Sequence, residues 1–88
     1  MLADIKKILG YKNNQFDSII KVYIDAAKYD LASSGISKDK ISEQDPLIYS
    51  AIVSYVLSRI DTYEYRELSS NTYMLEKDQL RHNSEYID

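Results

Sequence analysis

The stretch DPLIYSAIVSYVLSRID, residues 45–61, is the most apolar part of the chain and constrains its fold most strongly. Residues 46–60 contain a single charged side chain, Arg59. Asp45 and Pro46 indicate a helix start, because aspartate accepts unpaired amide hydrogen bonds and proline fits the first helical position. The apolar residues that follow cover about 200° of a helical wheel, roughly twice the stripe of a surface helix. Several neighbouring elements must therefore cover this helix.

The length of the apolar stretch excludes a membrane span. A spanning helix needs about 20 consecutive apolar residues, and this shorter run is interrupted by Ser50, Ser54 and Ser58. The opening residues, MLADIKKILG, contain no apolar run long enough for a signal peptide. We therefore expect neither membrane insertion nor export by that route.

Apolar residues recur mainly at helical spacing, and only two glycines and one proline interrupt the sequence. The pattern predicts an all-α protein, a small bundle of about four helices around a central apolar third helix. Gly10 and Gly35 are predicted to end the first and second helices, and Asn14 to cap the second. A polar break at 69–72 precedes the fourth helix, which Asn71 or Thr72 would cap. The expected helices span approximately residues 2–9, 14–34, 46–65 and 72–82.

The chain is long enough for one domain, which we place over residues 1–88. Residues 83–88 have little apolar content and are predicted to form a flexible C-terminal tail, although Tyr86 and Ile87 are unusual in a fully solvated segment. The absence of cysteine excludes disulfides and thiolate metal sites. Stability must therefore come from packing within the subunit or from partner subunits.

Motifs for catalysis or cofactor binding are missing. His82 is the only histidine. A surface position near a helix C-terminus explains it better than a metal site, which would have to combine this one imidazole with carboxylates. The sequence has no GxSxG and no glycine-rich phosphate loop. The loop acids Asp39, Glu43 and Asp45 lack the ligand spacing of an EF-hand. We predict no catalytic residue, no metal and no cofactor.

The charge balance argues against a DNA-gripping surface. Eleven Lys and Arg residues face 14 Asp and Glu residues, giving a net charge of −3 with no basic block. The polar connection at residues 36–44 is also longer than the turn of about three or four residues in a helix-turn-helix motif. We expect no sequence-specific DNA binding.

Protein interfaces fit the residue types better. Nine tyrosines stand beside one phenylalanine and no tryptophan, and tyrosine and arginine are enriched where interfaces bury surface. The three serines of the third helix form a band of small side chains, which would allow a close contact either inside the subunit or between subunits. The candidate partner-binding residues are Leu80, Arg81, His82, Tyr86, Ile87, Ser50, Ser54 and Ser58.

The order of segments resembles the head-tail connector proteins of long-tailed phages, small helical head-completion proteins often described as DNA packaging proteins. The likeness rests on FDSIIKVYIDAAKYDLASSG at residues 16–35, on DPLIYSAI at 45–52 and on DQLR at 78–81. It extends over nearly the whole chain, with DPLIYSAI and DQLR as its most specific parts.

The resemblance implies a structural protein of the virion and not an enzyme. Members of that family assemble as an oligomeric ring beneath the portal and extend the channel through which DNA passes without sequence-specific binding. The implied partners are the portal protein and neighbouring head-tail joining proteins, with assembly in the host cytoplasm and a monomer in isolation. The segment Leu80–Ile87 would reach toward the portal. The alternative is a small helical protein-binding or regulatory module of phage or bacterial origin.

Overall fold

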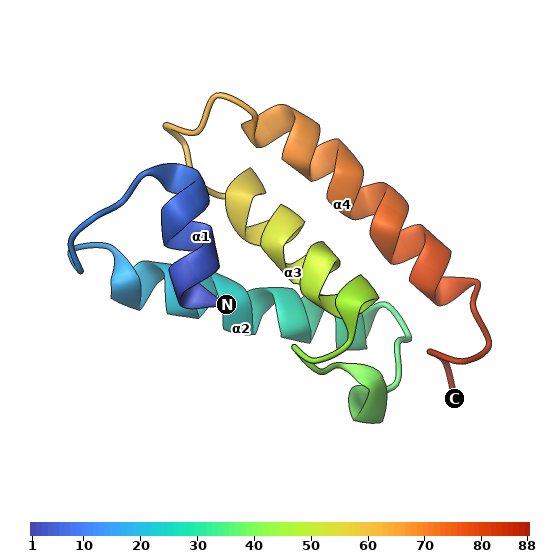
Figure 1. The fold of residues 1–88 in the computed structure, drawn as a ribbon. Coiled ribbons are helices and arrows are strands. Elements are labelled where there is room, and N and C mark those ends of the chain that lie inside the picture. Colours follow the sequence, from blue (N-terminus) through green and yellow to red (C-terminus); the bar gives the residue numbers. More distant parts are fainter.

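A computed structural model describes all residues 1–88 and contains four α-helices (Figure 1). Helix α3 lies between α2 and α4, and α1 packs against α2 near the N-terminus (Figure 1). The prediction of an all-α bundle with a central third helix is confirmed. The elements are α1 (Leu2–Leu9), α2 (Asp17–Ser33), a short 3-10 helix η1 (Lys38–Lys40), α3 (Pro46–Ser58) and α4 (Arg66–Arg81).

The start of α3 follows the predicted capping signal. Asp45 Oδ1 accepts hydrogen bonds from the backbone N–H groups of Leu47 and Ile48, at 2.9 and 3.3 Å. Pro46 occupies the first helical position, where its missing N–H costs nothing. The helix ends at Ser58 and not at residue 65, because Asp61 and Thr62 follow, residue types whose side chains compete for backbone hydrogen bonds and favour turns.

Glycine ends the first two helices as expected. Gly10 adopts the left-handed conformation with φ 76°, and its N–H bonds back to the last turn of α1. Gly35, with φ 100°, follows the C-cap of α2 and lets the N–H of Ile36 reach the carbonyl of Leu31 at 3.2 Å. A side chain would strain the backbone at both positions.

The predicted cap of the second helix is wrong. Helix α2 begins at Asp17, with Phe16 at the N-cap and no capping side chain. The side chain of Asn14 is engaged elsewhere, since its Oδ1 accepts a hydrogen bond of 2.9 Å from Lys6 Nζ. Asn14 therefore joins the loop to α1 and does not start α2.

The polar break predicted before the fourth helix is also wrong. Helix α4 begins at Arg66, so Asn71 and Thr72 lie inside it and cap nothing. Buried Tyr73, in the middle of the helix, supplies the tertiary contact that holds this polar segment in a helical conformation. A helix with one packed face tolerates polar residues on its remaining faces.

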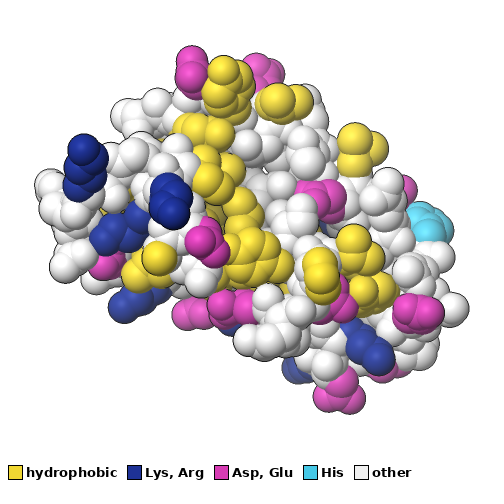
Figure 2. All heavy atoms as spheres, in the orientation of Figure 1, with side chains coloured by type: hydrophobic (Ala, Val, Ile, Leu, Met, Phe, Trp, Pro, Cys, Tyr) yellow, Lys and Arg dark blue, Asp and Glu magenta, His cyan; other side chains and the backbone are white.

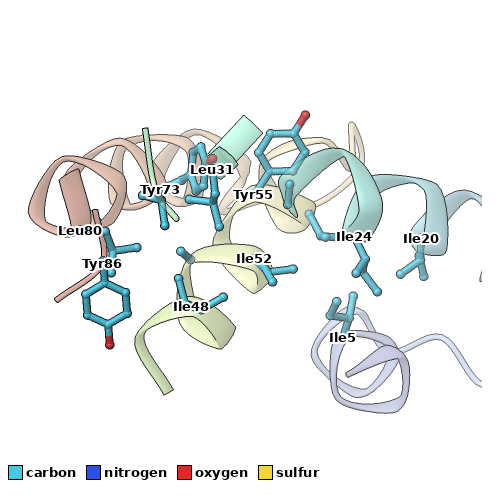
Figure 3. Close-up of a cluster of buried hydrophobic side chains, with 14 residues drawn as sticks. Ile5, Ile20, Ile24, Leu31, Ile48, Ile52, Tyr55, Tyr73, Leu80 and Tyr86 are labelled. Carbon is cyan, nitrogen blue, oxygen red and sulfur yellow. The ribbon is translucent and has the colours of Figure 1, made fainter. Parts of the chain in front are cut away.

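All four helices and the C-terminal tail contribute to one hydrophobic core (Figure 3). Helix α3 is covered from several sides, as its wide apolar arc predicts. Ala51, which follows Ser50 in α3, is also fully buried. The 14 core residues are Ile5, Ile20, Ile24, Ala27, Leu31, Ile36, Ile48, Ala51, Ile52, Tyr55, Val56, Tyr73, Leu80 and Tyr86.

The C-terminal tail packs onto the loop after α2 and onto the start of α3. The Tyr86 hydroxyl donates a hydrogen bond of 2.7 Å to Asp45 Oδ2. The N–H of Ser37 donates to the carbonyl of Tyr86 at 2.7 Å, and Ile36 and Ile87 form an isolated antiparallel bridge. The ring of Tyr86 is thereby buried against the core.

We predict that Ile52→Asp prevents folding. Ile52 is fully buried in the middle of α3, and burying an unpaired carboxylate costs several kcal/mol against a total stability of about 5–10 kcal/mol for a small domain. Far-UV circular dichroism and urea unfolding would show the loss. Leu47→Asp is the matched control, because Leu47 lies on the same helix and is about half exposed. A cooperatively folded Ile52→Asp protein would contradict the placement of this core.

Candidate protein-binding surfaces

The predicted C-terminal binding segment divides into buried and exposed residues. Leu80 and Tyr86 belong to the core, with 3% and 8% of their surfaces exposed. Arg81 and His82 are exposed at the end of α4, and Ile87 in the tail is 38% exposed. The two buried side chains therefore anchor the segment, and the other three face solvent.

One carboxylate joins the tail to the central helix. The hydrogen bond from Tyr86 lowers the pKa of Asp45, partial burial opposes this, and the capped N–H groups of α3 add to the lowering. The same contact with the Asp45 carboxylate raises the pKa of the Tyr86 hydroxyl. The tail is thus bound by an ionised acceptor at neutral pH.

Two of the three serines of α3 contact α4. Ser54 Oγ donates a hydrogen bond of 2.7 Å to Glu76 Oε1, and Ser50 Oγ donates to the other oxygen of that carboxylate. Ser58 Oγ donates to the backbone carbonyl of Tyr55. The first two serines therefore serve the contact between α3 and α4, and a role of the three serines in partner binding stays a prediction.

A second polar contact ties α2 to α4. Asp30 Oδ2 accepts hydrogen bonds from the Tyr73 hydroxyl at 2.5 Å and from Lys77 Nζ at 3.1 Å. Burial raises the pKa of Asp30, but these two donors outweigh it and lower the pKa below its ordinary value. Burial, together with the Asp30 carboxylate, raises the pKa of Tyr73. Asp30 is therefore ionised at neutral pH and holds two residues of α4.

The structure assembles no recognisable chemistry around the histidine. His82 Nδ1 lies 2.8 Å from the carbonyl of Asp78 at the exposed end of α4. No group of three His, Asp or Glu side chains could hold a metal ion. None of the helices has both the length and the apolar character required to cross a bilayer.

Sequence reasoning missed the exposed apolar face of α4. Tyr65, Leu68, Met74 and Leu75 are each more than half exposed. Leu68 and Leu75 are seven residues apart, which places them on the same side of a helix. The spacing was visible in the sequence, but the polar break assigned to residues 69–72 separated the two leucines. Hydrophobic side chains gather over the start of α4 in Figure 2.

Helix α2 carries a second exposed apolar face. Val22 and Tyr29, also seven residues apart, are more than half exposed, and Ile19 is 41% exposed. The residues Ile20, Ile24, Ala27 and Leu31 face the core from the other side of this helix. Phe16 and Ile19, at the start of the same helix, are exposed. Most of the exposed apolar surface therefore lies on the outer helices, and on α3 only Leu47 is a largely exposed apolar residue.

The comparison with known protein families gives one match. A family model described as phage connector protein matches residues 1–76. The matched region includes α1, α2, α3 and most of α4, and the tail lies outside it. No curated protein and no solved structure matches the chain.

We predict that Tyr86→Phe lowers the free energy of unfolding by about 1 kcal/mol at neutral pH, because it removes one hydrogen bond. Asp45 has a lowered pKa in the folded state, so this contribution is complete above the ordinary aspartate value of about 3.9. It is lost as the pH falls through the lower folded-state pKa. Urea unfolding across that pH range measures the difference.

Tyr29→Phe is the control for the tail hydrogen bond, because Tyr29 is largely exposed on α2. It should leave the free energy of unfolding unchanged at every pH. Equal unfolding curves for Tyr86→Phe and the unsubstituted protein would refute a stabilising bond between Tyr86 and Asp45.

Proposed function

Because the chain belongs to the phage connector protein family, we propose that it is a structural adaptor of the virion, located between head and tail. It docks on the portal as an oligomeric ring and extends the DNA channel, which completes the head after packaging. The single observation that carries this proposal is the family match over residues 1–76.

The exposed apolar faces support a role in assembly. Leu68 and Leu75 on α4, and Val22 and Tyr29 on α2, lie outside the core that stabilises the subunit. Scattered apolar residues are normal on monomers, but these residues are aligned on single sides of two helices. Packing of subunits buries apolar faces of this kind, and permanent interfaces between subunits depend on burying apolar surface.

The acidic balance of the subunit suits a channel wall that DNA passes without adhering. Each copy carries a net charge of −3, and a ring of copies multiplies that negative charge around the channel. Repulsion between like charges disfavours binding of the phosphate backbone. The portal protein and neighbouring head-tail joining proteins are therefore the partners we propose, and DNA is the cargo.

We assign the portal contact to the exposed part of the C-terminal segment. Its exposed side chains are the guanidinium of Arg81 and the imidazole of His82 at the end of α4, and the apolar side chain of Ile87 in the tail. Tyr86 and Leu80 hold this group against the body of the subunit. A test of docking must therefore replace the exposed residues, since replacing Tyr86 would also disturb the fold.

We expect the double variant Arg81→Ala with His82→Ala to fold normally and to bind purified portal about tenfold more weakly, a loss of about 1.4 kcal/mol. Light scattering of mixtures with portal measures the binding, and Lys21→Ala removes an exposed cation on α2 as the control. Unchanged binding of the double variant would refute the docking segment alone. If the unsubstituted protein never associates with portal, the proposed function is wrong.

A further inference from the structure

One side of α1, together with the residues that follow it, forms a basic hollow. Residues 1–15 contain three lysines and a single aspartate, in a chain that is acidic overall. Lys6 is paired with Asp17 at 2.9 Å, whereas Lys7 and Lys12 are exposed and form no ion pair. Figure 2 shows Lys and Arg side chains gathered over this end of the molecule. The hollow, about 470 Å³ in volume, is lined by Leu2, Ala3, Lys6, Lys7, Gly10, Tyr11 and Lys12.

The start of α4 has the opposite chemistry. Glu64 and Glu67 are exposed and form no ion pair, and Arg66 between them is paired with Asp61 at 3.1 Å. Tyr65 and Leu68 are more than half exposed within the same segment. Figure 2 shows acidic side chains on either side of hydrophobic ones at this end of α4. We call the segment Glu64–Leu68 the acidic apex.

We propose that the basic hollow of one subunit receives the acidic apex of a neighbouring copy. The inference rests on the proposed ring and specifies which surfaces meet in it. Lys7 and Lys12 lack acidic partners within the chain, and Glu64 and Glu67 lack basic ones. Complementary charge steers association and fixes its register, and the apolar side chains of both surfaces supply buried area.

The contact joins two different surfaces of the same chain, so it is heterologous. A heterologous contact leaves one free hollow and one free apex at the ends of every oligomer, and it closes into a ring when the rotation between subunits permits. A symmetric pair, in which two copies exchange both contacts, would stop at a dimer. Oligomer length therefore separates the two arrangements.

Cross-linking tests the contact directly, because the chain has no native cysteine. We expect a short bismaleimide reagent to link a mixture of Lys7→Cys and Glu67→Cys proteins into mixed dimers, with little product from either protein alone. A protein carrying both substitutions should give a ladder of oligomers longer than dimers. The pair Lys38→Cys and Glu67→Cys is the control, since Lys38 lies outside the hollow.

Charge reversal tests the role of the ion pairs. Lys7→Glu with Lys12→Glu, and separately Glu64→Lys with Glu67→Lys, should each weaken self-association at least tenfold at low salt, and mixing the two proteins should restore it. Sedimentation velocity measures the association, and circular dichroism confirms folding. Reversal without effect, products of the doubly substituted protein that stop at dimers, or no mixed dimer from the two singly substituted proteins at high concentration would each overturn the inference.

Portal binding of the same samples separates this inference from the proposed function. A protein that binds portal but forms no link between hollow and apex would refute the subunit contact and leave the adaptor role standing. A protein that forms the ladder but never binds portal would refute the adaptor role and leave the contact between copies intact.

Discussion

Enclosing α3 is the physical constraint on which the rest of the structure depends. A domain of this size buries only about 60–65% of the surface of its unfolded chain, and the central helix requires cover from several sides. Helices α1, α2 and α4 and the tail all turn their apolar residues toward the common core. Apolar side chains on the outer sides of α2 and α4, such as Val22 and Leu75, stay more than half exposed.

Polar contacts between α3 and α4, and between α2 and α4, help to hold α4 against the other helices. Helix α4 contributes only two residues to the core, Tyr73 and Leu80. Ser50 and Ser54 of α3 donate hydrogen bonds to Glu76 of α4. Asp30 of α2 accepts hydrogen bonds from Tyr73 and Lys77 of α4. Because hydrogen bonds supply part of the attachment, α4 can keep leucines on its outer face. The same helix thus serves the fold on one side and assembly, in our proposal, on the other.

The parts of the fold that depend on residues adjacent in the sequence were predictable from it. Gly10 and the Asp45–Pro46 pair set their helix boundaries through short-range backbone chemistry. The start of α4 was not predictable, because packing of Tyr73 overrides the weak helix preference of the preceding polar residues. The contact of Tyr86 with Asp45 joins residues 41 positions apart, and no local pattern announces it. The alignment of Leu68 and Leu75 on one side of α4 could be recognised only once that helix was known to be continuous.

The two oxygens of the Asp45 carboxylate accept hydrogen bonds from different parts of the chain. Oδ1 caps α3 and Oδ2 accepts the tail hydroxyl. Pulling the C-terminus outward therefore breaks a bond at one oxygen while the other still secures the first helical turn. The first turn of α3 therefore keeps its cap when the tail hydroxyl is displaced, but the buried ring of Tyr86 must leave the core at the same time, so the tail resists displacement through its ring more than through its hydrogen bond.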